Sequence, residues 1–262
     1  MINFFKKIFF FFWGIGKLSL FNKASILMYH SVGNNLAFFT VKPDNFEKQL
    51  KYLKSENFYV IKLSELINKI KKGEDVGNCV CLTFDDGYLD NIEIVLPLLK
   101  KYNFPATIFI PTNLLGKKFI NSEGVSLLVL SEKNIREADS NLLEFMPHTD
   151  SHVLLNDLPE NKYNGELLVS RTKIELLTGK LANILAYPKG KYSESVINYL
   201  KLNNWLAAVT VEPGLIDRAT NLYGLNRNAI VLNTSFSEFK LKTSSRLEIY
   251  IRLKKWIKNL KK

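Results

Sequence analysis

The sequence predicts an α/β protein in which parallel strands alternate with helices within one main folded domain. Three observations lead to this fold class: short β-branched or aromatic runs, amphipathic segments between several of them, and distinctive polar residues directly after strands. The runs are SILMYH (25–30), NCVCLTF (78–84), ATIFI (106–110), ANILAYP (182–188), AAVTV (207–211) and AIVL (229–232). A chain of 262 residues is long enough to bury one full core in this arrangement.

Helical patterns occupy the intervals between several of these strands. Asp44, Ser64 and Asp90 can each cap a helix that starts beside them, and residues 160–179 and 193–204 show two further helical patterns. Such helices cover a parallel sheet that is either open or closed into a barrel. In both cases, functional residues are expected at the carboxyl ends of the strands.

The composition is that of a globular protein with a strongly basic balance. Hydrophobic residues make up 47% of the chain, and the formal net charge is +11. That charge indicates an anionic surface or ligand, which is either nucleic acid or acidic lipid. Much of it lies at the two ends beside aromatic and aliphatic residues, and the interior shows no nucleic-acid motif. An anionic membrane surface is therefore the expected partner, and nucleic acid is not.

The amino-terminal segment, residues 1–22, is hydrophobic and basic. Its uncharged stretch, residues 8–16, is about half as long as a helix that spans a bilayer, and Lys17 interrupts it without a small-residue cleavage site. We expect the segment to be retained as an interfacial anchor; the alternative is an element packed on the main domain.

The carboxyl-terminal segment, residues 237–262, reads as a basic amphipathic helix. A helical wheel gathers the apolar residues Ile249, Tyr250, Leu253, Trp256, Ile257 and Leu260 on one side and the basic residues Arg252, Lys254, Lys255, Lys258, Lys261 and Lys262 on the other. This helix can lie in the headgroup region of an anionic membrane or dock on its own domain. The domain between the two terminal segments would span residues 23–236.

The two cysteines, Cys79 and Cys81, fall on one face of a predicted strand, where they cannot easily form a disulfide. Half of a metal site is the other reading, but the chain has no second cysteine pair. We expect two buried thiols, which favours reducing surroundings.

Two adjacent carboxylates, Asp85 and Asp86, follow the strand NCVCLTF directly. Their side chains point in diverging directions, so one can bind a metal ion while the other stays free as a base. Gly87 supplies a tight turn at which the backbone can approach a substrate. Taken alone, this sequence is weak evidence, because an Asp-Asp-Gly sequence is more often a simple turn.

Two of the three histidines in the chain, His148 and His152, lie four residues apart. On a helical turn this spacing presents both imidazoles to one point, although an isolated pair could also be structural. Two histidines and one carboxylate would form a metal site with open positions for water and substrate.

The segments TFDDG (83–87), HTDSH (148–152) and AYPKG (186–190) resemble, in this order, the first three motifs of the polysaccharide deacetylase family, also called the NodB homology domain or carbohydrate esterase family 4. The stretches 26–32 and 207–214 are similar to the branch that deacetylates poly-N-acetylglucosamine in biofilms. This resemblance covers about 200 residues and implies a distorted (β/α)7 barrel.

The resemblance also implies residue roles. The metal ligands would be Asp86, His148 and His152, with Asp85 as catalytic base and His30, at the end of the first strand, as catalytic acid. The cofactor would be one divalent ion, with zinc favoured and nickel or cobalt also fitting the ligands.

The same resemblance implies an oxyanion and substrate-binding group. The backbone N–H groups of Tyr88 and Lys189 would stabilise the oxyanion of the reaction, and Tyr187 would contribute to substrate binding.

Three departures from the family pattern affect these expectations. Ala186 stands where the family usually has an arginine that steadies the base, and no histidine follows His152, where the family usually has its acid. Met146 and Pro147 replace a Gly-Ser pair before the first motif histidine. The first two departures also characterise the biofilm branch.

The predicted activity is metal-dependent hydrolysis of N-acetyl groups from amino sugars, in a polysaccharide or in a lipid-linked glycan. The alternative is a membrane-associated carbohydrate-binding protein that kept the fold and lost its chemistry. The expected location is the periphery of a bacterial membrane, with the cytoplasmic face favoured.

Overall fold

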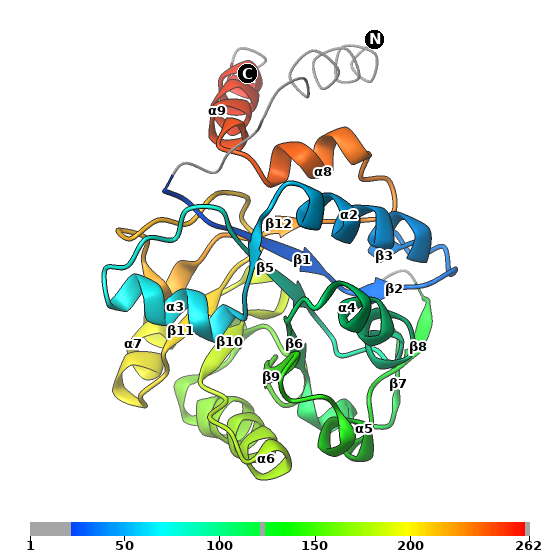
Figure 1. Ribbon diagram of the computed structural model, residues 1–262. Helices are drawn as coiled ribbons and strands as arrows, with labels where there is room; N and C mark the ends of the chain where they lie inside the picture. The colour runs from blue at the N-terminus through cyan, green and yellow to red at the C-terminus, as the bar shows by residue number, and fades with distance from the viewer. Residues whose placement is uncertain (1–21, 121–123, 260–262) are drawn as a thin grey trace.

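A mainly parallel sheet forms the centre of the molecule (Figure 1). The structure is a computed structural model that describes residues 22–120 and 124–259. Its central sheet has the strand order β12–β1–β5–β6–β9, with β4 also paired to β5. The strands are β1 (Ser25–Tyr29), β4 (Tyr59–Val60), β5 (Cys79–Phe84), β6 (Ala106–Ile110), β9 (Leu143–Pro147) and β12 (Asn228–Ala229). All these pairings are parallel.

Three smaller sheets complete the strand layer. They pair β10 (Ile184–Ala186) with β11 (Ala207–Val209), β2 (Ser31–Val32) with β3 (Thr40–Val41), and β7 (Lys118–Ile120) with β8 (Ser126–Leu128). Only the β7–β8 pair is antiparallel. Strand pairing links neither β9 to β10 nor β11 to β12 within the described residues, so the expected closed barrel is not seen there. The α/β class with a parallel sheet is confirmed.

Helices surround the strands in Figure 1. They are α2 (Pro43–Ser55), α3 (Leu63–Lys71), α4 (Leu96–Tyr102), α5 (Glu132–Glu137), α6 (Val169–Thr178), α7 (Glu194–Leu202), α8 (Phe236–Lys242) and α9 (Arg246–Asn259). Two π-helical turns, η1 (Asn91–Val95) and η5 (Asn164–Leu168), precede α4 and α6. Short 3₁₀ turns are η2 (Thr112–Leu114), η3 (Leu155–Asp157), η4 (Glu160–Lys162), η6 (Pro188–Gly190) and η7 (Leu222–Gly224).

Burial on both faces explains why β1, β5 and β6 read as mainly apolar runs. All six residues of β5 are buried, as are all five of β1 and β6. Cys79 and Cys81 lie within β5 as buried free thiols, as expected.

Most predicted elements are found, with two kinds of difference. Two of the three predicted caps were wrong: Lys42 and Lys62 stand at the N-cap positions of α2 and α3, and the hydroxyl of Ser64 donates to Glu144 instead. Asp90 stands at the N-cap position of η1, as predicted, although its side chain makes no capping hydrogen bond. Strand β9 was not predicted, because its sequence LEFMP contains a charged residue and a proline.

The terminal segments are described only in part. Residues 1–21 lie outside the described residues, so the predicted amino-terminal anchor is not tested. Within the part of the chain that the structure describes, no helix has both the length and the apolar character needed to cross a membrane. Helix α9 meets the amino end of the sheet, where Lys23 Nζ lies 2.5 Å from Glu248 Oε1.

Candidate active site

Asp86, His148 and His152 come together at the carboxyl end of the sheet, although 62 residues separate the first two in sequence. One potential ligand atom from each lies within 4.8 Å of the others. His148 Nε2 is 3.7 Å and His152 Nε2 is 3.4 Å from Asp86 Oδ1. Two imidazole nitrogens and one carboxylate oxygen are a donor set that suits zinc and similar divalent ions.

The carboxylate of Asp86 is oriented by its neighbours. Tyr88 Oη donates to Asp86 Oδ2 at 2.9 Å, while Asp86 Oδ1 is buried without a hydrogen-bond partner among the described residues. A buried carboxylate oxygen without a partner is costly unless a cation binds it. Asp86 has φ +68° and Gly87 φ +59°, and a Cβ on Gly87 would lie 2.9 Å from Ile110. Only glycine fits this turn without strain in its own backbone and without displacing the side chain of Ile110.

The two histidines lie in a loop after β9, not on the helical turn that their spacing indicated. His148 Nδ1 bonds the carbonyl oxygen of Ala186 at 2.7 Å, which leaves Nε2 to face Asp86. Thr149 and His152 have positive φ, which no helical turn has, so the backbone between the two imidazoles is irregular. Burial and then the nearby His148 lower the pKa of His152 to about 4, so its ring is neutral at pH 7, as a metal ligand requires.

The neighbouring carboxylate, Asp85, is held by an arginine that sequence reasoning missed. Arg227, just before β12, donates from both terminal nitrogens to the two oxygens of Asp85, each at 2.6 Å. Its Nε donates to the carbonyl of Thr210 at 2.8 Å, and both charged side chains are buried. Burial would raise the pKa of Asp85, but the charge and hydrogen bonds of Arg227 hold that pKa well below its usual range.

The ion pair between Asp85 and Arg227 explains how the site can lack the usual motif arginine at position 186. Ala186 lacks the charge of the usual motif arginine, and Arg227 supplies that charge from another strand end. Asp85 therefore remains an anion throughout the working pH range of most enzymes.

His30, the predicted acid, lies at the same end of the sheet, directly after β1. Tyr29 pairs with Phe84 in the register of β1 and β5, and the N–H of Asp85 donates to the carbonyl of Tyr29 at 2.9 Å, so His30 and Asp85 follow adjacent strand ends. His30 Nδ1 is buried without a partner among the described residues, and the ring lies 5.4 Å from that of Phe39. The residue as a whole is half-buried, and a half-buried imidazole at this edge of the sheet can exchange a proton with a bound substrate.

Tyr88 and Lys189 were predicted to donate their backbone N–H groups to the oxyanion. The N–H of Leu130 donates to the carbonyl of Gly87, and the N–H of Leu89 donates to the carbonyl of Leu128. Tyr88 lies between these two antiparallel bonds, and its own N–H takes no part in them. Lys189 lies in η6 with a left-handed φ of +53° and an exposed side chain.

Tyr187 does not reach the surface. Its side chain is completely buried, and its hydroxyl donates to the carbonyl of Tyr223 at 3.1 Å. Its ring stacks on the partly exposed Tyr192 at a centroid distance of 4.6 Å. The contribution of Tyr187 to substrate binding stays a prediction.

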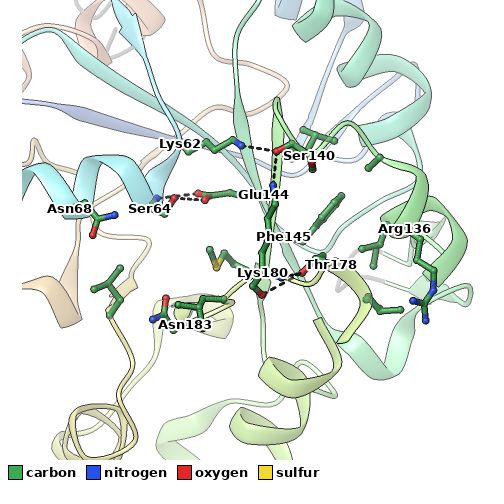
Figure 2. A pocket seen from close by; sticks show the side chains of 17 residues that line it. Lys62, Ser64, Asn68, Arg136, Ser140, Glu144, Phe145, Thr178, Lys180 and Asn183 are labelled. Atoms are coloured by element: carbon green, nitrogen blue, oxygen red, sulfur yellow. Dashed lines mark hydrogen bonds between the residues drawn. The ribbon is translucent and has the colours of Figure 1, made fainter. Parts of the chain in front are cut away.

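The cavity shown in Figure 2 is separate from this site. It has a volume of about 580 Å³, and Leu143 and Glu144 at the beginning of β9 line it, as do Asn183 and Leu206 just before β10 and β11. It therefore opens at the amino end of the strands. Functional residues of parallel α/β folds gather at the opposite, carboxyl end, where Asp85 and its neighbours lie.

Comparisons with known proteins agree with this geometry. The family model described as polysaccharide deacetylase matches residues 72–206. YxkH of Bacillus subtilis, which is assigned to the polysaccharide deacetylases, is 31% identical over 83% of this chain and 75% of its own length. A poly-beta-1,6-N-acetyl-D-glucosamine N-deacetylase of Staphylococcus aureus is 28% identical over 79% of this chain and 78% of its own.

Solved structures show the same fold. The Streptococcus pyogenes deacetylase PplD, solved in complex with acetate, superposes with a TM-score of 0.74 at 29% identity, over 85% of this chain and 98% of that one. IcaB from Ammonifex degensii shares the fold at a TM-score of 0.73 and 20% identity, over 84% of this chain and 97% of that one. Sequence, structure and relatives therefore agree, and this chain belongs to the polysaccharide deacetylase family of hydrolases.

Proposed function

We propose that this enzyme uses a divalent metal ion, with zinc favoured, to hydrolyse N-acetyl groups on the amino sugars of a glycan. The observation that carries the proposal is the cluster of Asp86, His148 and His152 beside a carboxylate, Asp85, that Arg227 keeps ionised. A catalytically inactive sugar-binding relative would have no need to keep both the ligands and the base.

The roles of the residues follow from their chemistry. A divalent ion held by the three side chains would supply the charge that acidifies water and polarises an amide carbonyl. Asp85 would take the proton from the attacking water, and the N–H of Tyr88 would donate to the oxyanion that forms. The amine cannot leave as an anion, so His30 would protonate it before the carbon–nitrogen bond breaks. The N–H of Lys189 would be a second donor to the oxyanion.

Metal removal provides the direct test of this chemistry. Purified protein incubated with poly-N-acetylglucosamine should release acetate, a chelator should abolish the release, and added zinc, nickel or cobalt should restore it. Acetate release that survived complete removal of metal would contradict the proposal.

We predict that His30→Ala lowers turnover on the order of a hundredfold, the usual size of a general-acid contribution, while metal content and fold stay unchanged. The alkaline limb of the pH–rate profile should also flatten, because that limb reports loss of the protonated acid. Steady-state kinetics across pH would measure both effects. Near-normal activity with an unchanged profile would show that another group delivers the proton.

The substrate is either a polymer or a lipid-linked sugar. The Staphylococcus aureus relatives are named as enzymes of poly-beta-1,6-N-acetyl-D-glucosamine, which supports a polymeric N-acetylglucosamine substrate for this chain. A membrane-bound enzyme could also meet lipid-linked sugars, so both classes are candidate substrates.

We further propose that the protein binds the surface of an anionic bacterial membrane, with the cytoplasmic face favoured. Ile249, Leu253 and Trp256 form a stripe on α9 that is 50%, 38% and 60% exposed, respectively. The neighbouring Arg252 and Lys254 are also exposed and would face acidic headgroups. Tyr250, which was predicted on this apolar side, packs against the core instead.

Liposome binding tests the exposed stripe. The double variant Leu253→Ser, Trp256→Ser should bind anionic vesicles roughly tenfold more weakly, because two apolar side chains no longer enter the interface. Removal of residues 1–22 should likewise make the protein easier to release with salt. Sedimentation would measure both changes, with Leu202→Ser as control, since Leu202 is 82% exposed on α7. Equal binding by full-length protein and by protein lacking both 1–22 and α9 would contradict the membrane proposal.

A further inference from the structure

The carboxylate of Glu166 binds the short segment that connects the two histidines of the site. Its Oε2 accepts hydrogen bonds from the backbone N–H of Asp150 at 3.1 Å and of Ser151 at 2.9 Å. Its Oε1 accepts one from the hydroxyl of Ser151 at 2.6 Å. Both oxygens of one side chain are thus used to fix two consecutive residues between His148 and His152.

The connecting segment has no regular structure of its own. Thr149 and His152 both have φ of +62°, a conformation that costs non-glycine residues of order 1–3 kcal/mol and persists only where surrounding contacts impose it. Besides Glu166, η2 supplies such contacts. Asn113 N donates to Asp150 O at 2.8 Å, and Thr112 Oγ1 donates to Asp150 Oδ1 at 2.6 Å. Two separate elements therefore hold the segment.

The position of Glu166 also has an unusual local cause. It lies in the π-helical turn η5, directly before α6. A π turn adds one residue to a helix and shifts the direction of its side chains, and such turns are frequent at functional sites. Here the turn directs the Glu166 carboxylate to the backbone of Asp150 and Ser151.

We propose that Glu166 is a positioning residue that keeps His152 in the geometry needed to bind the metal ion with Asp86 and His148. This inference rests on the proposed metal site. Glu166 acts through the backbone of the connecting segment and does not itself ligate the ion. Residues that orient metal ligands in this way typically contribute about 10-fold to 100-fold to metal affinity.

Three substitutions separate hydrogen-bond geometry from negative charge. Glu166→Gln removes the charge but keeps a carbonyl oxygen that can accept from both N–H groups, and Ser151 can then accept from the new amide. Glu166→Asp keeps the charge, but its shorter side chain cannot reach the same groups. Glu166→Ala removes both. Glu166 and Ser151 are partly exposed, so water can satisfy the freed groups in these variants.

The experiment measures zinc affinity by competition with a chromophoric chelator, the visible spectrum of the cobalt-loaded protein, and the Tm of the metal-free protein. Glu166→Ala and Glu166→Asp should bind zinc about 10-fold to 100-fold more weakly with an altered cobalt spectrum, and Glu166→Gln should stay within about threefold of wild type. The metal-free Tm should change little. Glu160→Ala, at an exposed glutamate in η4, is the matched control and should bind zinc normally.

Two results would overturn the role of Glu166 alone: normal affinity in Glu166→Ala, or normal affinity in Glu166→Asp combined with weak binding in Glu166→Gln. The latter would show that charge matters and geometry does not. A wild-type protein that bound no zinc, nickel or cobalt would overturn the metal site itself and this role with it. Because the readout is metal affinity, the result does not depend on which glycan is the substrate.

Discussion

Asp86→Ala should lose its bound metal, whereas Asp85→Asn should keep the metal and lose turnover. The reason is that Asp86 Oδ1 faces both imidazoles, while the two oxygens of Asp85 face Arg227. Loss of a metal ligand removes the ion, but loss of the base leaves binding intact and blocks only the proton transfer. We expect turnover to fall by at least about a hundredfold in both variants.

Metal analysis of the two purified variants beside wild type would measure this difference. Asp75→Asn provides a control, since Asp75 is an exposed carboxylate in the loop before β5. Stoichiometric metal in Asp86→Ala would refute the ligand assignment, and full turnover in Asp85→Asn would refute the base.

Arg227→Met should be nearly inactive and less stable, because it leaves the buried carboxylate of Asp85 without its partner. Breaking a buried ion pair by removing one member typically costs about 3–5 kcal/mol. With the guanidinium gone, burial dominates and the pKa of Asp85 rises. The acidic limb of the pH–rate profile should then move toward neutral pH, because more of the base is protonated.

The contribution of Asp85 to the pH dependence of stability should change sign in Arg227→Met. In the wild type the folded pKa of Asp85 lies below the unfolded value of about 3.9, so the pair stabilises the protein above that pH and the contribution is lost as the pH falls further. In Arg227→Met the folded pKa lies above the unfolded value, so stability should fall as the pH rises through this range. Denaturant unfolding at several pH values would measure this. Arg218→Met, at an exposed arginine, is the control, and an unshifted acidic limb in Arg227→Met would contradict the account.

The ligands and the base could be predicted from sequence because each belongs to a short contiguous motif. Asp85 and Asp86 end a strand that is recognisable by its apolar run, and the two histidines lie within five residues of each other. Their convergence depends on both segments following strands that end at the same edge of the sheet, which the parallel fold class already implies. Their local conformation could not be predicted, because the His148–His152 spacing fits a helical turn as well as the observed loop.

Arg227 and Glu166 were not predicted, because neither belongs to a local motif that indicates its hydrogen-bond partners. Asp85 and Arg227 are 142 residues apart, and their contact arises only when β12 pairs with β1. One signal was available: Ala186 leaves the base without its usual arginine, and among the six arginines of the chain only Arg227 lies just before a predicted strand. Glu166 offered no such signal, since its position depends on a π turn that sequence periodicity does not reveal.

The distorted barrel that the family resemblance implied is seen only in part among the described residues. Strands β10 and β11 form a separate pair, and the described residues show no ladder that joins them to β9 or β12. The site is nevertheless assembled, because side-chain bonds bridge these gaps. His148 reaches the carbonyl of Ala186 in β10, and Arg227 reaches Thr210 directly after β11.

The central claim, metal-dependent removal of acetyl groups from a glycan, is tested most directly by mass spectrometry of candidate glycans after incubation with zinc-loaded protein. Poly-N-acetylglucosamine and a lipid-linked N-acetylated sugar would be compared, with Asp85→Asn as the inactive control. We predict a loss of acetyl mass from one of the two classes with wild type, and no loss with Asp85→Asn. Glycans that bind the zinc-loaded wild type and keep every acetyl group would contradict the account and favour a carbohydrate-binding protein.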